Sequence, residues 1–131
     1  MSKLKTKLMN FNNALQRLKE AAEELKNNNA GDVIRDGVIQ RFEFTYELAW
    51  KTTKEYLEDI GIVDKNSPKA VIKEAYAQKL ITNEKEWLLM LNDRNLTSHL
   101  YKEKMAVEIA HRITNSYIGE FENLLSNLKK Q

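Results

Sequence analysis

Apolar residues recur every three or four positions along almost the whole of this 131-residue chain. That spacing places them on one face of an α-helix, whereas a half-buried strand requires alternation at every second residue, which no segment shows convincingly. One proline and four glycines leave long stretches without a residue that interrupts a helix. The pattern therefore predicts an all-α protein: an antiparallel up-and-down helical bundle of four to five helices with a four-helix-bundle core.

The first two expected helices are separated by a short polar run. Apolar spacing predicts the first helix over Leu4–Leu25, ending at the asparagine- and glycine-containing run 27–31. Asp32 is expected to cap the second helix, which spans about 33–60. Gly61 is expected to close it, because glycine tolerates the positive φ that commonly follows a helix.

Later helix starts carry clear capping signals. Ser67 followed by Pro68 is typical of an N-cap and the first helical position of a short helix. Asn83 and Glu86 have the spacing of a capping box for a fourth helix. A last long helix is expected over about 105–128. Three long helices and two short ones fit a bundle better than any fold built on a sheet.

Composition limits the class of protein and its partners. The hydrophobic share of 42% and charged share of 31% suit one compact domain over residues 1–131. The absence of cysteine excludes disulfides and thiolate metal sites, and no cofactor motif is present. Without a signal-peptide-like N-terminus or a membrane-length apolar run, we expect a cytoplasmic protein that does not contact a membrane. The net charge of +2 is too small for nucleic-acid binding by bulk electrostatics, so any such contact must be local.

Eight consecutive residues, from Arg94 to Tyr101, combine a cation, an imidazole, an amide, two hydroxyls and a phenol. Arginine presents a planar fork of donors that matches a phosphate, and His99 can transfer protons near neutral pH. On one continuous helix, Arg94 and His99 would lie roughly 140° apart around the axis. Thr97 and Ser98 favour turns and caps, so we predict that the helix ends here and that His99 and Tyr101 swing back toward Arg94.

A second group of polar residues lies in the middle of the second expected helix. Glu43 and Glu47 share one helix face, at a spacing also seen in carboxylate metal sites. No further ligand set accompanies them, and Arg41 and Lys51 offer ordinary ion pairs. We therefore expect Arg41, Glu43 and Glu47 to form a secondary polar cluster near a dimer interface or a cleft, without a metal.

The same helix is rich in aromatic side chains, which are Phe42, Phe44, Tyr46 and Trp50. They cover more than one helix face, and one bundle core cannot bury them all. Some of them are therefore expected to meet another chain.

The segment from Arg94 matches the pattern Arg-x4-His-x-Tyr, and the run 41–51 reads RFEFTYELAWK. With these two features the chain resembles the HEPN superfamily, specifically the small helical proteins that pair with minimal nucleotidyltransferases and are named nucleotidyltransferase substrate-binding proteins. The resemblance covers most of residues 5–125. One difference is Lys102, because many relatives carry an acidic residue directly after the motif tyrosine.

The resemblance implies a ribonuclease in the toxin branch of that family. By this analogy the chain is a metal-independent endoribonuclease toxin of a toxin-antitoxin pair, in which Arg94 stabilises the phosphate and the transition state, and His99 transfers a proton. Asn95 and Ser98 would support this motif. Cleavage of RNA by its own 2′-hydroxyl needs both a base and an acid, so a single motif histidine per chain implies a homodimer with a composite site.

The resemblance also implies regulation by a cognate minimal nucleotidyltransferase, which adds AMP to the motif tyrosine, Tyr101 here. The alternative function is non-catalytic: a substrate-binding subunit in which Arg94 only holds a nucleotide or nucleic-acid phosphate. A third is a structural homodimer without activity. The residues alone also allow Arg94 to be a helix C-terminal cation, His99 a turn residue and Tyr101 a core anchor, and His111 is expected to be solvated.

Overall fold

The computed structural model describes residues 2–28, 31–99 and 102–131, and its described part is helical without strands, which confirms the all-α prediction. The helices follow in the order α1 (Lys3–Asn28), α2 (Gly31–Asp59), α3 (Pro68–Ala77), α4 (Glu84–Leu96), α5 (Glu103–Arg112) and α6 (Ile118–Lys129). A 3₁₀ turn (Thr97–His99) follows α4, and a π-helical segment (Ile113–Tyr117) joins α5 to α6. None of the described helices carries an apolar stretch long enough to span a bilayer.

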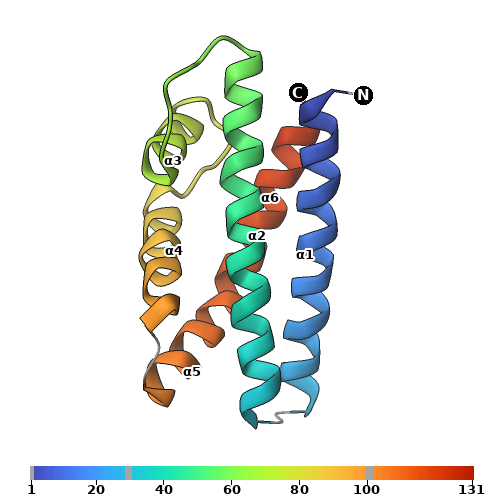
Figure 1. The fold of residues 1–131 in the computed structure, drawn as a ribbon, viewed down its shortest axis with the longest axis vertical. Helices are drawn as coiled ribbons and strands as arrows, with labels where there is room; N and C mark the ends of the chain where they lie inside the picture. Colours follow the sequence, from blue (N-terminus) through green and yellow to red (C-terminus); the bar gives the residue numbers. More distant parts are fainter. Residues whose placement is uncertain (1, 29–30, 100–101) are drawn as a thin grey trace.

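α1 and α2 form a long antiparallel pair along one side of the bundle (Figure 1). Side chains of α2 donate hydrogen bonds to backbone carbonyls of α1: Arg41 to Arg17 over 2.7 Å, and Thr52 to Lys7 over 3.3 Å. The acceptor moves toward the start of α1 as the donor moves along α2. These bonds fix how the two helices are aligned along their common axis.

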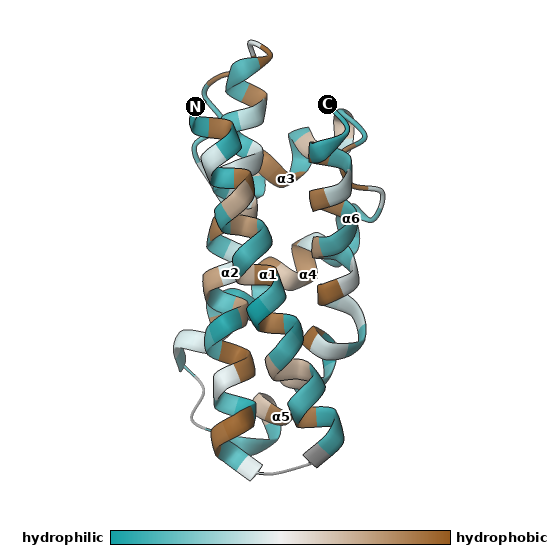
Figure 2. Ribbon diagram, turned by 90° about the vertical axis from the view of Figure 1, so that its right-hand side faces the viewer, coloured by the Kyte–Doolittle hydropathy of each residue, from teal (hydrophilic) through white to brown (hydrophobic). Residues whose placement is uncertain are grey.

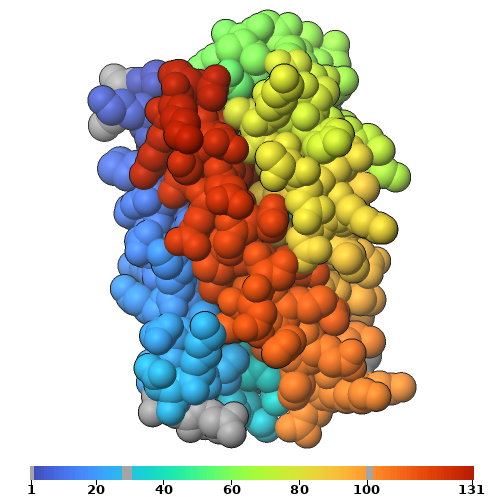
Figure 3. Space-filling model, turned by 180° about the vertical axis from the view of Figure 1, so that it is seen from behind, coloured from blue at the N-terminus to red at the C-terminus, as the bar shows by residue number. Residues whose placement is uncertain are grey.

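The C-terminal helices lie across the back of this pair. Seen from behind, α6 lies between α1 and the stacked α3 and α4, and it continues into α5 at the other end of the molecule (Figure 3). The N–H of Ile118 bonds to the carbonyl of Ile113, five residues earlier, as in a π-helix. The single long helix expected over about 105–128 is therefore one helical path that contains a π segment.

Aromatic rings fill the centre of the core. The ring of Phe42 lies 5.7 Å from that of Tyr117 and 6.1 Å from that of Phe121, measured between centroids. Tyr46 is also fully buried, whereas 67% of Phe44 is exposed. The expectation that one core cannot bury all the aromatics of α2 is thus met by Phe44. That another chain covers it remains a prediction.

Figure 2 shows hydrophobic residues as short bands between hydrophilic ones along the long helices, as amphipathic packing requires.

Most predicted helix ends are confirmed. The side chains of Ser67 and Asn83 accept hydrogen bonds from the N–H groups of Ala70 and Glu86, so both residues are N-caps. In a capping box the Glu86 carboxylate would also accept a hydrogen bond from the N–H of Asn83. Here that carboxylate accepts a hydrogen bond from Ser116 Oγ instead.

The predicted cap of α2 is wrong. α2 begins at Gly31, whose φ is +61°, so Asp32 lies inside the first turn and not before it. From there its carboxylate pairs with Arg35 at 3.4 Å, an i,i+3 contact along the helix surface. At the other end, Gly61 has φ +90°, as expected for a residue that closes a helix.

Candidate functional site

The end of α4 brings the motif arginine to the edge of the bundle. α4 stops at Leu96, which confirms the predicted break, and Arg94 lies in its last turn. Thr97 Oγ lies 2.7 Å from the Arg94 carbonyl oxygen and 2.8 Å from Glu43 Oε2, and its one hydrogen can be donated to either. Ser98 Oγ donates to the carbonyl of Asn95 over 3.0 Å. These hydroxyls bind carbonyls that have no helical partner at the end of α4.

Two carboxylates of α2 hold the guanidinium of Arg94. Glu43 Oε2 lies 3.2 Å from Arg94 Nη1, and Glu47 Oε1 lies 3.7 Å from Arg94 Nε. About a quarter of the Arg94 side chain is exposed, at 26%. The run 41–51 and the Arg-x4-His motif, far apart in the sequence, therefore meet in one site.

This arrangement leaves one edge of the guanidinium available to a ligand. Arginine has five N–H donors in a planar fork. Glu43 and Glu47 occupy the Nη1 and Nε sides, and Nε itself is buried. Within the described residues Nη2 has no partner, and it is open to solvent. A phosphate can bind there in a charge-assisted contact while the carboxylates fix the plane of the fork.

A buried carboxylate next to Arg94 fixes α4 in place. Asp93 is 1% exposed and binds Arg112 with two hydrogen bonds, of 2.8 and 2.9 Å. Tyr117 donates a further hydrogen bond to Asp93. The π segment follows Arg112 directly and ends at Tyr117, and both residues bind the same carboxylate. Contact with Asp93 raises the pKa of the Arg112 guanidinium, and burial, followed by Asp93, raises the pKa of Tyr117.

Tyr46 is a buried residue of α2 that lies close enough to Glu47 and Arg94 to be affected by their charges. Its hydroxyl is buried and has no hydrogen-bond partner within the described part of the chain. Burial raises the pKa of Tyr46, the nearby charge of Glu47 raises it further, and the charge of Arg94 partly opposes this. The phenol is therefore neutral near neutral pH.

The remaining motif residues are placed differently. His99 ends the 3₁₀ turn with its side chain exposed, and within residues 2–28, 31–99 and 102–131 it makes no hydrogen bond or ion pair. Asn95 is exposed on α4, and Tyr101 lies outside the described residues. His111 is exposed on α5, where its ring lies beside Asn115.

The structure separates Arg41 from Glu43 and Glu47. Side chains two positions apart on a helix point about 200° apart around its axis. Arg41 therefore faces α1, whereas Glu43 and Glu47 face α4. Lys51 pairs with Glu47 at 3.7 Å, as expected. In the part of the chain that the structure describes, no three metal-ligating side chains come together.

Three contributors to the site were not singled out in the sequence. Asp93 binds Arg112 and Tyr117, which lie 19 and 24 positions further along the chain, and only the fold shows that they meet. Thr97 was recognised as a turn former but not as a partner of Glu43. Tyr46 looked like one more aromatic residue of α2, and no sequence signal marks its proximity to the charges of Glu47 and Arg94.

Comparisons with known proteins identify a family and one similar curated protein. The family model described as "Nucleotidyltransferase substrate binding protein like" matches residues 6–130. The probable ribonuclease HepT of Haemophilus influenzae is 31% identical over 104 residues, which make up 76% of this chain and 70% of that protein.

Solved structures share the fold over nearly the whole chain. A Thermus thermophilus protein is 36% identical, with a TM-score of 0.82, over 91% of this chain and 98% of its own. A Haemophilus influenzae protein, described as showing the fold of a substrate binding domain of a nucleotidyltransferase, is 27% identical, with a TM-score of 0.85, over 93% and 98%. A tri-AMPylated Shewanella oneidensis HEPN toxin in complex with its MNT antitoxin matches at a TM-score of 0.77 over the full length of both chains, and at 16% identity this likeness concerns the fold alone.

Neutralising one carboxylate beside Arg94 should increase its affinity for small anions. In Glu43→Gln the repulsion between the carboxylate and a bound phosphate, on the order of 1 kcal/mol at a partly exposed site, disappears. We expect the dissociation constant for pyrophosphate to fall by about 3- to 10-fold, measured by NMR titration of the Arg94 Nε–H resonance. Glu24→Gln, which removes an exposed carboxylate on α1, is the matched control. Equal affinities in the two variants would contradict this account of the site.

Alkaline pH should destabilise the protein through Tyr46. The pKa of Tyr46 is raised in the folded state, so above about pH 10 the unfolded chain loses this proton while the folded chain retains it. The stabilising contribution is present below about pH 10 and is lost as pH rises. Above pH 10 the free energy of unfolding of Tyr46→Phe should fall less steeply with pH than that of wild type. The two slopes should differ by up to about 1.4 kcal/mol per pH unit.

Urea denaturation at pH 9, 10 and 11 measures this slope. Tyr76→Phe, which removes an exposed phenol, is the control. If wild type and Tyr46→Phe lose stability in parallel over this range, Tyr46 is not the group that resists ionisation.

Proposed function

The chain belongs to the nucleotidyltransferase substrate binding protein like family, and on that premise we propose that it is a metal-independent HEPN endoribonuclease, a toxin held in check by a minimal nucleotidyltransferase. The observation that carries this proposal is the oriented guanidinium of Arg94. Arg94 lies in the last turn of α4 and the 3₁₀ turn that follows it carries His99, so a phosphate-binding cation and an imidazole occur at the same end of α4.

The proposed reaction uses the 2′-hydroxyl of RNA as the nucleophile. A base removes the 2′-hydroxyl proton, the oxygen bonds to the adjacent phosphorus, and the bond from phosphorus to the 5′-oxygen breaks. An acid protonates the leaving oxygen, which yields a 2′,3′-cyclic phosphate and a 5′-hydroxyl. Arg94 binds the non-bridging oxygens, where negative charge accumulates in the transition state. His99 transfers one of the two protons.

A second copy of the chain would complete the site. Each chain contributes one motif histidine, and one imidazole cannot act as base and acid at the same moment. In a twofold homodimer the same surface of both copies meets, so two Arg94 and two His99 side chains can face one RNA strand. We place this dimer in the cytoplasm, where RNA and a nucleotidyltransferase partner are available.

The partner would silence the enzyme through Tyr101. The phenol oxygen bonds to the α-phosphorus of ATP, pyrophosphate leaves, and the phenol proton passes to solvent. The added AMP carries negative charge and bulk two residues beyond His99 and competes with an RNA phosphate for Arg94. The Shewanella oneidensis HEPN toxin, which shares the fold, is described as tri-AMPylated, and this supports AMP addition as the modification, while the choice of Tyr101 rests on the motif.

A second candidate function rests on the Haemophilus influenzae structure, which is described as a substrate binding domain of a nucleotidyltransferase. In this case the free edge of Arg94 holds a nucleotide phosphate for the partner and no bond is cleaved. The exposed side chain of His99, which makes no hydrogen bond within the described residues, agrees with this function as well.

Expression in a host cell separates the two functions. We expect wild type to arrest growth and fragment total RNA. His99→Ala should lower the cleavage rate about 10²- to 10⁴-fold, and Arg94→Ala about 10²- to 10³-fold. Co-expression of the nucleotidyltransferase should relieve the arrest and add the mass of AMP to the peptide that contains Tyr101.

His111→Ala is the matched control, because it removes the only other histidine, which is exposed on α5. It should behave as wild type. Harmless expression with intact RNA, together with a stable complex between the chain and the partner, would instead establish the substrate-binding subunit. Harmless expression without such a complex would leave a structural dimer.

A further inference from the structure

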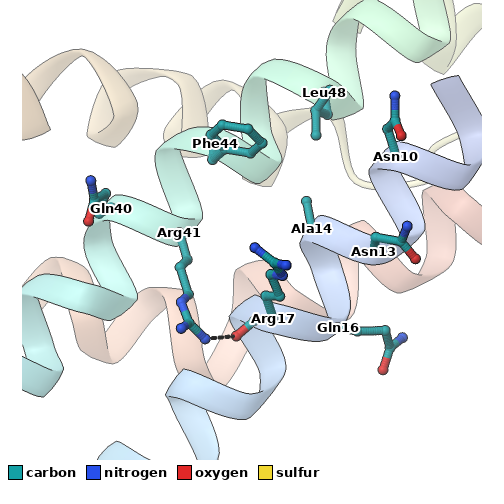
Figure 4. A pocket seen from close by; sticks show the side chains of 9 residues that line it. All are labelled: Asn10, Asn13, Ala14, Gln16, Arg17, Gln40, Arg41, Phe44 and Leu48. Carbon is teal, nitrogen blue, oxygen red and sulfur yellow. Dashed lines mark hydrogen bonds between the residues drawn. The ribbon is translucent and has the colours of Figure 1, made fainter.

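A hollow of about 670 Å³ lies between α1 and α2, on a different side of α2 from Arg94. Some of the side chains between positions 10 and 17 of α1 and between positions 40 and 48 of α2 line it, among them Arg17, Arg41 and Phe44 (Figure 4). Its volume is in the range of pockets that hold small ligands or a short segment of a polymer. The ribonuclease chemistry proposed above makes no use of it.

The hollow carries positive charge that the protein does not balance. No carboxylate is among its lining residues. Arg17 and Arg41 form no ion pair within the described part of the chain, whereas Arg35, Arg94 and Arg112 each pair with a carboxylate. Arg41 donates to the Arg17 carbonyl oxygen over 2.7 Å, which fixes one end of its guanidinium and leaves the other donors available. Two neighbouring unpaired guanidinium groups favour a ligand with phosphates.

The other lining side chains recognise more than charge. Four of them are carboxamides, which donate and accept hydrogen bonds at once and match the edges of nucleobases: Asn10, Asn13, Gln16 and Gln40. Phe44 is 67% exposed, an unusual position for a ring of this size in a chain that buries Phe42 completely. Bases stack on exposed aromatic rings, at about 1–3 kcal/mol per base.

We propose that this hollow is a second RNA-binding site, which holds a single-stranded segment of the substrate by its phosphates and bases, and that RNA rather than another protein chain covers Phe44. An acidic peptide would use the arginines but not the exposed ring and the carboxamides together. The inference rests on the proposed function for its ligand, RNA. α2 connects the two sites, because Glu43 faces Arg94 while the adjacent residue Phe44 faces the hollow. The helix is about 10 Å across, a distance that about three nucleotides span.

The test measures binding without cleavage. A fluorescein-labelled 12-nucleotide RNA with 2′-O-methyl groups cannot be cleaved, and fluorescence anisotropy in the His99→Ala background gives its dissociation constant. The double variant Arg17→Gln with Arg41→Gln should weaken binding at least about 10-fold and reduce the salt slope by about two. Lys69→Gln with Lys73→Gln, two exposed lysines of α3, removes the same charge elsewhere and should change affinity far less.

Phe44→Leu isolates the stacking contribution. It should weaken binding about 5- to 100-fold, which corresponds to 1–3 kcal/mol, and leave the salt slope unchanged. Both Phe44 and Arg17 have exposed side chains, and the Arg17 carbonyl that accepts from Arg41 persists in Arg17→Gln. These two single variants therefore keep the test valid if the double variant does not fold.

Several outcomes would overturn the inference. One is equal affinity in the arginine and lysine double variants, and another is unchanged affinity in Phe44→Leu. A third is loss of the nucleotidyltransferase complex in the arginine variant with unchanged RNA affinity, which would make the hollow a protein-docking surface. If wild type cleaves RNA but the arginine double variant binds the labelled RNA with an unchanged dissociation constant, only this second site is rejected and the ribonuclease function stands. RNA binding that depends on the hollow, without cleavage by wild type, would reject only the ribonuclease.

Discussion

The bidentate ion pair between Asp93 and Arg112 determines where the motif of this protein lies. A buried carboxylate is stable only when its charge is paired, and removal of Arg112 would leave the charge of Asp93 uncompensated in the core. The pair, with Tyr117, attaches α4 to the C-terminal helices across a π segment. Because Asp93 points into the core, the next residue, Arg94, points toward α2.

The charges around Arg94 balance two requirements. Glu43 and Glu47 fix the plane of the guanidinium, so less conformational freedom is lost when a phosphate binds. The same carboxylates offset its charge and weaken its attraction for anions in general. A site built in this way gives up affinity for orientation, which suits a residue whose main partner is the transition state. The exposed turn after α4 then carries His99 at the edge of the site, where a second chain can approach.

The sequence predicted what depends on local spacing. Helical periodicity gave the bundle, and Ser67, Pro68 and Asn83 marked helix starts because caps act over three or four residues. Thr97 and Ser98 predicted the end of α4. Contacts between distant segments could not be predicted in this way. Nothing local reveals that Asp93 meets Arg112 and Tyr117, that the last helix contains a π segment, or that Arg41 turns to α1 while Glu43 turns to Arg94.

Incubation of the purified protein with RNA in excess EDTA tests the central claim most directly. An oriented arginine and a histidine need no metal, and attack by the 2′-hydroxyl leaves a defined chemical end. The account predicts cleavage in EDTA, with 2′,3′-cyclic phosphate and 5′-hydroxyl ends by mass spectrometry, and its loss in Arg94→Lys, which keeps the charge but not the planar fork. Intact RNA, or 3′-hydroxyl and 5′-phosphate ends that appear only with added metal, would contradict it.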